Sequence, residues 1–276
     1  MHRIARLTFG GGTGAFALCR VRRALCCLAC VGGTLHAHAA TAPFTPRRDT
    51  EVVEVLRERP LSAQEKAWRV LRAAARDKPD DARMAVAVAA QAIQWSRQDG
   101  DPRWLGQAQA ALAHWWLQAT PPPQVRLLRA TIWQSTHDFD AALRELRELP
   151  RWADGLPPDQ RVQAWLTLAS VLLVTGRYDE AQVACEALGP LQAPWLAQAC
   201  GLELRSYRGH ADEAQQGLDQ LAAHAPRESA DFIHLMRAEL AERSGHTRVA
   251  ETLYQTLLLR QDSAYTQGAY ADFLLD

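Results

Sequence analysis

The sequence predicts an all-α fold: a right-handed α-solenoid of about six antiparallel helix hairpins, followed by one C-terminal helix. Apolar residues recur at intervals of three and four along most of the chain, which is typical of amphipathic helices. One helix–turn–helix pattern also returns at a nearly constant period, which indicates a repeat architecture. No segment alternates between apolar and polar residues, so we expect no β-strands.

The clearest hairpin occupies residues 164–188. Its first helix carries an apolar stripe that includes Trp165 and Leu168, and its second helix carries the small residue Ala181 on its own stripe. Gly176 lies between them and can adopt the positive φ that ends many helices. We therefore predict two helices in close approach around this glycine.

The same pattern recurs on both sides of that hairpin. Small residues occupy the equivalent place in four second helices, 39, 33 and 36 residues apart: Ala142, Ala181, Ala214 and Ala250. A helix–turn–helix with a period in the mid-thirties resembles the tetratricopeptide repeat. With the first position of that repeat at Val162, the preferred sites hold Trp165, Leu168, Ala169, Gly176, Tyr178 and Ala181.

The resemblance covers about residues 50–276 and departs from the repeat pattern in places. Gly201 and Leu202 exchange the usual small and large residues, and His137 replaces a turn glycine. We expect divergent hairpins over 50–120, clearer repeats over 123–262, and an incomplete repeat over 263–276.

The divergent part begins with a predicted short helix over Thr50–Arg59. Ser62 and Glu65 form a capping-box pattern that opens a second helix through Arg76, so Thr50–Pro79 would be the first hairpin. Further helices are expected from Asp80 or Asp81 to Gln98, over Trp104–Leu117, and over Val125–Thr136.

At the other end, residues 264–276 have the pattern of a first helix without a second. An unpartnered amphipathic helix would expose its apolar stripe. This helix either caps the solenoid or belongs to a truncated form of a longer protein, and we favour truncation.

Residues 1–39 have the features of a secretory signal peptide. They contain five arginines and no acid, then a short apolar run over 24–35, and Ala37 and Ala39 bracket a small-residue cleavage pattern. We expect cleavage near Ala39, a mature leader over 40–49, and an exported, periplasmic protein. The alternatives are an uncleaved membrane anchor and a lipid attached to Cys30.

The charge of the chain excludes several classes of function. The remainder after residue 39 carries a net charge of −5 and only two lysines, Lys66 and Lys78, which disfavours binding to nucleic-acid phosphates. No long apolar stretch is free of interruption, so a multi-pass membrane protein is excluded. Gly10–Ala15 matches a dinucleotide-binding pattern, but no acid follows until Asp49, so we reject nucleotide binding.

Only Cys185 and Cys200 follow the signal region. They are expected on neighbouring helices of successive hairpins, where a disulfide could form in an oxidising compartment. The alternative is a pair of small buried residues that never react.

Two other residue types invite a functional hypothesis. His137, His210 and His246 each lie at a hairpin turn, but their spacing is that of the repeat, so we interpret them as polar turn residues and predict no metal site. The nine tryptophans indicate either core packing, which we favour, or an exposed peptide-binding surface.

The resemblance to the repeat family implies a concave groove lined by the first helix of each hairpin. Transferred by position, it implies eight groove residues: Gln124, Thr131, Gln134, Ser170, Glu203, Tyr207, Glu239 and Glu242. The alternative is that these side chains are solvated helix faces without a ligand. The C-terminal half of the set is acidic and contains no lysine, so a neutral or basic protein segment would fit it.

We therefore expect an exported scaffold that binds a protein or peptide in this groove, with no catalysis, cofactor or metal. Membrane contact would involve only the signal segment. A different hypothesis is a structural subunit of an envelope complex, anchored through Cys30 or an uncleaved head. A metal-dependent enzyme that uses the turn histidines is a third.

Overall fold

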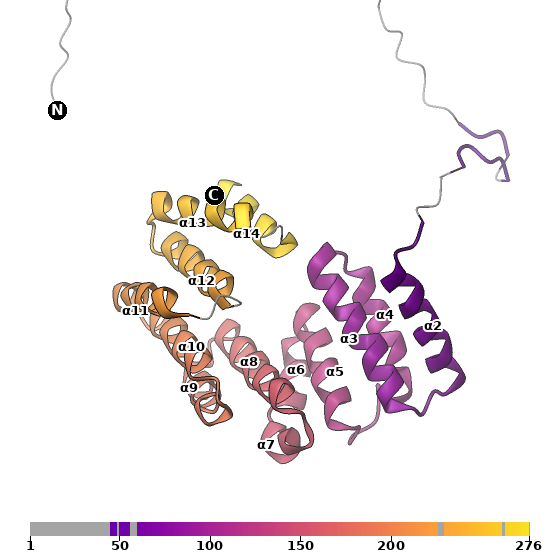
Figure 1. Cartoon of the computed structure of the whole chain (residues 1–276), viewed down its shortest axis with the longest axis horizontal. Coiled ribbons are helices and arrows are strands. Elements are labelled where there is room, and N and C mark those ends of the chain that lie inside the picture. The colour runs from indigo at the N-terminus through magenta and orange to yellow at the C-terminus, as the bar shows by residue number, and fades with distance from the viewer. Residues whose placement is uncertain (1–44, 49, 56–59, 226–228, 261–262, 276) are drawn as a thin grey trace, which may run out of the picture. The chain divides into compact units, whose positions relative to one another are not determined.

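The helices of this protein form a curved stack in its computed structural model (Figure 1). The structure describes residues 45–48, 50–55, 60–225, 229–260 and 263–275, and within them all regular structure is helical. The chain divides into two units, residues 1–59 and 60–276, and the stack belongs to the second. None of the described helices has the length and apolar character that a bilayer crossing requires.

The N-terminal part of the stack contains α2 (Ala63–Asp77), α3 (Ala82–Asp99), α4 (Arg103–Ala111), the 3₁₀ turn η1 (Ala113–Trp115), α5 (Pro123–Ser135), α6 (Phe139–Leu146), α7 (Leu149–Trp152) and η2 (Ala153–Gly155). The C-terminal part contains α8 (Pro158–Val174), α9 (Tyr178–Glu186), η3 (Gly189–Leu191), α10 (Pro194–Tyr207), α11 (Ala211–His224), α12 (Ala230–Arg243), α13 (Thr247–Arg260) and α14 (Ala264–Leu275). The prediction of an all-α helical repeat is confirmed.

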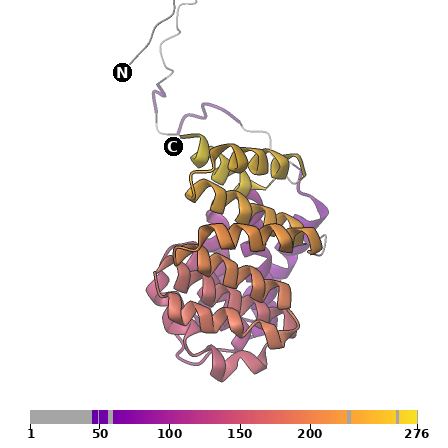
Figure 2. The ribbon, with the colours of Figure 1, turned by 90° about the vertical axis from the view of Figure 1, so that its left-hand side faces the viewer.

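Successive helices pair as antiparallel hairpins. Among the described residues the pairs are α3 with α4, α5 with α6, α8 with α9, α10 with α11, and α12 with α13. Turned by 90°, the C-terminal hairpins lie as successive layers from pink through orange to yellow (Figure 2). Five hairpins are formed where about six were expected, because α2 packs on α3 without a preceding helix of its own among the described residues.

Two predictions about the divergent N-terminal half need correction. Residues 50–55 are not helical, so neither the helix predicted over Thr50–Arg59 nor a first hairpin over Thr50–Pro79 forms in the part the structure describes. The helix predicted over Trp104–Leu117 ends as α4 at Ala111 and continues only as η1. A helix this short gains little from propensity and depends on its packing against α3.

The predicted helix starts in this region are confirmed. The Ser62 hydroxyl accepts a hydrogen bond from the Glu65 amide at 3.2 Å, and the Glu65 carboxylate accepts one from the Ser62 amide at 2.7 Å. The Asp81 carboxylate accepts bonds from the amides of Arg83 and Met84 at the start of α3. These bonds satisfy amides that have no partner within the helix.

The turns inside four hairpins share one backbone geometry. A left-handed residue follows each first helix, namely His137 (φ 61°), Gly176 (φ 72°), Gly209 (φ 91°) and Gly245 (φ 74°). The amide after each of these residues donates to a carbonyl five residues earlier, as from Arg177 to Leu172 at 2.8 Å. This bond closes the helix in a Schellman motif and sets the direction of the second helix.

Buried apolar side chains continue from one hairpin to the next. The largest cluster joins α5 to α10 and includes Ala142, Leu172 and Ala181. Trp68 meets Trp95 and Trp104 edge to face, and Trp95 is tilted against Trp104. The ring centroids lie 4.8–5.5 Å apart, and the group ties α2, α3 and α4 together. Packing is thus the role of these tryptophans.

The exchanged residues Gly201 and Leu202 are accommodated by the facing helix. Leu202 of α10 extends towards Gly217 of α11, where a Cβ would collide with the leucine methyl groups. Gly217 therefore leaves the space that the Leu202 side chain occupies.

The C-terminal helix α14 is not the unpartnered helix that the sequence predicts. Its residues Tyr270 and Phe273 pack on the fully buried Tyr254 of α13. It also contacts α3, and a Cβ built on Gly100 would lie 3.3 Å from Cβ of Ala264. Within residues 60–276 the curvature of the stack therefore brings α14 against α3 (Figure 1).

The signal segment 1–39, Cys30 and the Gly10–Ala15 pattern lie outside the described residues.

Candidate functional site

A cavity of about 580 Å³ opens on the concave side of the stack. We call it the chamber. Six helices line it through these residues: Arg97 of α3; Gln134 of α5; Gln163, Leu166, Thr167, Ala169, Ser170 and Leu173 of α8; Trp195, Leu196, Cys200 and Glu203 of α10; Phe232, Leu235, Met236 and Glu239 of α12; and Tyr265 of α14. All but α14 are first helices of hairpins, as the repeat resemblance implies.

The α5–α8 side of the chamber is neutral. The Gln134 amide donates to the Ser170 hydroxyl at 3.2 Å, which joins equivalent positions of successive hairpins. The Gln163 amide donates to the Thr167 hydroxyl at 3.2 Å, and that hydroxyl donates to the Gln163 carbonyl at 2.8 Å. Such amides offer further donors and acceptors to a peptide backbone.

Arg97 is the cation of the chamber. Its guanidinium is accessible from the cavity but surrounded by protein, and this desolvation lowers the pKa of Arg97. It forms no ion pair with any carboxylate of the described residues.

The α10–α12 side of the chamber is acidic. The Tyr265 hydroxyl donates to Glu239 Oε1 at 2.9 Å, whereas the Glu203 carboxylate has no hydrogen-bond or ion-pair partner among the described residues. Burial, and then the nearby charge of Glu239, raise the pKa of Glu203 to about 7, although Arg243 opposes the shift. Burial also raises the pKa of Glu239, against the hydrogen bond from Tyr265.

A second cavity of about 540 Å³ adjoins the acidic side and is lined by Tyr207, Glu242, Arg243 and Tyr254, together with Glu239 and residues of α14. The Tyr254 hydroxyl donates to Glu242 Oε2 at 2.6 Å. Burial and this bond raise the pKa of Tyr254. The Arg243 guanidinium lies 4.7 Å from the centroid of the Tyr207 ring, so this cavity contains its own cation–π pair.

A third cavity of about 310 Å³ lies between α3, α5 and α8. The Gln124 amide donates to Gln160 at 3.1 Å across it. Thr131 lines it but is buried, and its hydroxyl donates to the Leu127 carbonyl at 2.9 Å. Because this hydroxyl already has a backbone partner, Thr131 is suited to packing more than to ligand contact.

The eight implied groove residues thus divide among three cavities. Gln134, Ser170, Glu203 and Glu239 line the chamber, Tyr207 and Glu242 line the second cavity, and Gln124 and Thr131 line the third.

Several chamber residues were not predicted from the sequence. Arg97 comes from a divergent hairpin, and Tyr265 comes from α14, whose contact with α3 has no local signal. Trp195 and Phe232 lie near the starts of successive first helices, with ring centroids 6.4 Å apart. The sequence signal for Trp195 and Phe232 was an aromatic residue in the first turn of two successive first helices.

Cys185 of α9 and Cys200 of α10 are joined by a disulfide, with Cα atoms 5.5 Å apart. The bond crosses the boundary between two hairpins, and Cys200 contributes to the chamber wall.

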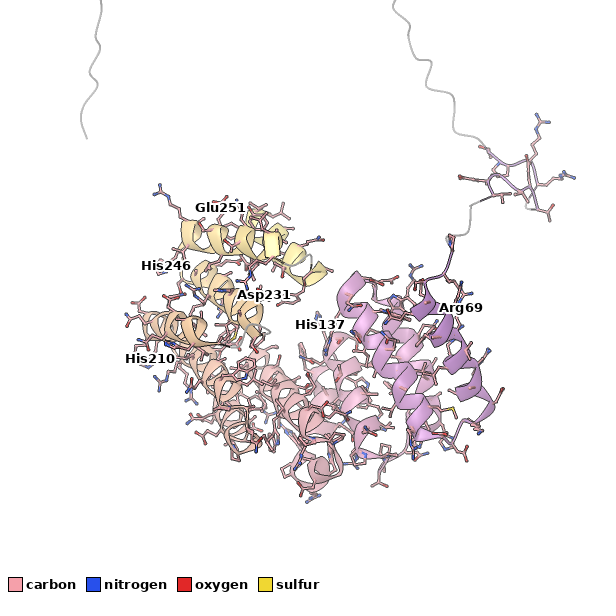
Figure 3. All side chains as sticks on the ribbon, in the orientation of Figure 1. Arg69, His137, His210, Asp231, His246 and Glu251 are labelled. Atoms are coloured by element: carbon pink, nitrogen blue, oxygen red, sulfur yellow. A yellow bond between two sulfur atoms is a disulfide. The ribbon has the colours of Figure 1, made fainter. Side chains whose placement is uncertain are left out.

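The turn histidines do not gather in one site. Figure 3 shows His210 and His246 at the same margin of the stack, apart from His137. His137 holds the left-handed turn position, whereas the other two follow a glycine. The described residues contain no group of three or more His, Cys, Asp or Glu side chains placed to hold a metal ion.

Comparison with known proteins adds information on architecture. No protein-family model and no curated protein matches the sequence. Three solved tetratricopeptide repeat structures are similar in fold. A thermophilic protein of Thermus thermophilus is 18% identical, with a TM-score of 0.47 over 70% of this chain and 98% of that one. YrrB, described as having an unusual peptide-binding site, is 10% identical, with a TM-score of 0.39 over 74% and 99%. A protein from Parabacteroides merdae is 15% identical, with a TM-score of 0.42 over 75% and 90%.

The architecture is decided by the molecule's own hairpins, which repeat from α5 to α13 with one turn geometry and first helices on the concave side. The fold is a tetratricopeptide-like helical repeat. In this TPR-like stack the chamber is part of the concave surface. Its wall is completed by Tyr265 of α14, the helix that packs against α3.

Proposed function

We propose that this protein is an exported scaffold that binds a neutral or basic segment of another protein in the chamber, without catalysis. The observation that carries the proposal is the chamber itself, whose volume of about 580 Å³ lies within the usual range of binding pockets. Rings, amides and carboxylates from five helices and the Arg97 guanidinium of α3 line it, and such groups can recognise both the backbone and the side chains of an extended segment.

The polar groups of the chamber suit recognition better than reaction chemistry. Among its lining residues, no hydroxyl or thiol nucleophile is paired with a histidine base. Glu203 and Glu239 give one side a negative charge that complements a basic partner.

The proposal of export is supported by the Cys185–Cys200 disulfide, since such bonds persist mainly in oxidising compartments. The signal-like composition of residues 1–39 supports it as well.

Site-directed photo-crosslinking in the native cells tests the function. A photoreactive phenylalanine analogue replaces Phe232, which lies in the chamber and is 45% exposed. The matched control replaces Val183 on α9, which is 62% exposed and contributes nothing to the chamber.

We expect a discrete crosslinked product from position 232 and none from position 183. The product should disappear when Ser170→Arg fills the chamber in the same protein. Equal labelling from both positions, or a product unaffected by Ser170→Arg, would contradict binding in the chamber.

A further inference from the structure

The acidic side of the chamber holds a carboxylate in an unfavourable environment. Glu203 is largely enclosed by protein, and its side chain has no hydrogen-bond or ion-pair partner among the described residues. The nearest like charge, Glu239, comes from the facing helix α12. Two carboxylates brought together out of water favour a cation between them, because an enclosed charge without a partner is costly.

One aromatic ring, that of Tyr265, contacts these carboxylates, and the rings of Trp195 and Phe232 lie about two helical turns further along the chamber wall. Trp195 and Phe232 meet edge to face with centroids 6.4 Å apart, and Phe232 is 45% exposed. Tyr265 is 62% exposed, and its hydroxyl is held by Glu239. Ring faces attract cations, and the planar, weakly hydrated guanidinium group stacks on them better than an ammonium group does.

In the adjoining second cavity, an arginine of the chain itself stacks on an aromatic ring near two carboxylates. There, Arg243 stacks over Tyr207 beside Glu239 and Glu242. Arg243 also donates to the Ser206 hydroxyl at 3.3 Å, so its guanidinium is committed to that cavity. The charge of Arg243 also acts on Glu203 and Glu239, but among the described residues it forms no ion pair with either carboxylate.

The remaining cation of the chamber does not fill this place. Arg97 lies on α3 and is not within ion-pair distance of Glu203 or Glu239. The charges that shift the pKa of Glu203 are those of Glu239 and Arg243.

We propose that Glu203 and Glu239, with the ring of Tyr265, form a subsite for a guanidinium group, so that the partner segment anchors through an arginine side chain. The inference rests on the proposed function and specifies the residue that the chamber selects. Arginine is the occupant because the carboxylates accept its fork of N–H donors while the Tyr265 ring offers a face to the guanidinium plane.

Saturation-transfer NMR with single-residue probes tests the subsite directly. The probes are N-acetyl-arginine N-methylamide, its neutral citrulline counterpart, and the lysine counterpart, each added to the full-length protein. We expect saturation transfer to the arginine probe, about tenfold weaker binding of the lysine probe, and none of the citrulline probe.

Variants assign the binding to the chamber. Glu203→Gln and Glu239→Gln should each weaken binding of the arginine probe at least about tenfold. Glu213→Gln is the matched control, because Glu213 is an exposed carboxylate of α11 outside the chamber, and it should leave binding unchanged. Circular dichroism checks that each variant keeps its helices.

The dependence of binding on pH gives an independent readout. Glu203 faces Glu239 and Arg243 from α12 and lies near Tyr265 of α14, while the lining residues of α8 carry no ionisable group. Because Glu203 has a pKa of about 7 in the free protein, arginine binding should strengthen several-fold from pH 6 to pH 8. The Glu203→Gln variant should show a flatter profile.

Equal binding of arginine and citrulline probes, or arginine binding unaffected by both Glu203→Gln and Glu239→Gln, would overturn the subsite. The scaffold function fails separately, if crosslinking from position 232 gives no chamber-dependent product. A crosslinked product that persists in Glu203→Gln with undiminished yield would support the scaffold and refute the arginine anchor.

Discussion

At the scale of single residues, His137 differs from its equivalents in the other hairpins. It holds the left-handed turn position with φ 61°, where the next three hairpins have glycine. A residue with a Cβ pays about 1–2 kcal/mol in this conformation. Its ring lies 5.6 Å from that of Phe139, which offsets part of the cost.

We therefore predict that His137→Gly stabilises the protein by about 1 kcal/mol, and that Gly176→Ala destabilises it by a similar amount. Urea unfolding followed by circular dichroism measures both changes. His210→Gly is the control, because His210 has φ −102° and gains nothing from glycine. A His137→Gly variant no more stable than the control would contradict the cost assigned to this turn.

Glu203 makes a second residue-scale prediction, on stability. Its pKa of about 7 in the folded protein lies above the ordinary value of 4.5, so folding favours the protonated carboxyl. The free energy of unfolding should therefore fall as pH rises from about 4.5 to 7, and change no further from this group above that range.

Glu203→Gln removes this loss. At pH 8 the variant should be more stable than the natural protein by roughly 2 kcal/mol, because a tenfold change in proton affinity corresponds to about 1.4 kcal/mol and residual solvent contact reduces the full effect. Below pH 4.5 the two proteins should become equally stable. Denaturation at both pH values measures the difference, and a constant gap at all pH values would contradict the titration of Glu203.

At the scale of helices, a buried cluster of charged side chains joins α5 to its neighbours. Arg129 pairs with Glu145 of α6, which also lies 3.3 Å from Nε of Arg126. Arg129 also donates to the carbonyls of Trp115, Trp116 and Gln118 at 2.9–3.0 Å. These carbonyls end the α4–η1 segment, so one side chain fixes the irregular connection between two hairpins.

We predict that Arg129→Met costs about 3 kcal/mol or more, because it leaves a buried carboxylate under-compensated and three carbonyls without this donor. Arg151→Met is the control, since its pair with Glu148 is exposed and should contribute less than about 1 kcal/mol. Thermal unfolding of both variants measures the difference. Equal losses would show that the buried group does not fasten these helices.

Helices with caps and regular apolar stripes were predicted well from the sequence. The start of α2 at Ser62 and the turn at Gly176 depend on local chemistry, which the sequence displays. The helix expected over Thr50–Arg59 is different, because residues 50–55 are not helical. Packing partners distant in sequence decide such segments, and periodicity does not contain them.

For residues 60–276 as a whole, the main difference from expectation is the return of α14 to α3. The contact is close at Gly100, where a Cβ would lie 3.3 Å from Ala264. The curvature of the stack is the sum of small rotations between successive hairpins, so it cannot be predicted from any single residue. This curvature brings Arg97 and Tyr265 into one chamber. Sequence reasoning therefore identified Glu203 and Glu239, which lie at repeat positions, but missed Arg97 and Tyr265.

We predict that Ala264→Phe separates α14 from α3 and costs about 1–3 kcal/mol through overpacking. Hydrogen exchange should rise in 263–275 and near Gly100, while α13 stays protected through Tyr254. Gly268→Ala is the control, because a Cβ there meets no atom within 4 Å and favours the helix. Unchanged exchange near Gly100 in Ala264→Phe would show that the contact is not a stabilising one.

The disulfide between Cys185 and Cys200 has a consequence for how the stack comes apart. Repeat proteins fray from their ends, one hairpin interface at a time, since each unit contacts mainly its neighbours. This bond crosses the interface between α9 and α10, so Cys185 and Cys200 stay together even after the packing of that interface is lost. Unravelling from the C-terminus should therefore gain less chain entropy at this interface while the bond is intact. The redox state of the surroundings thus sets how easily heat or pulling force unfolds the stack beyond α10.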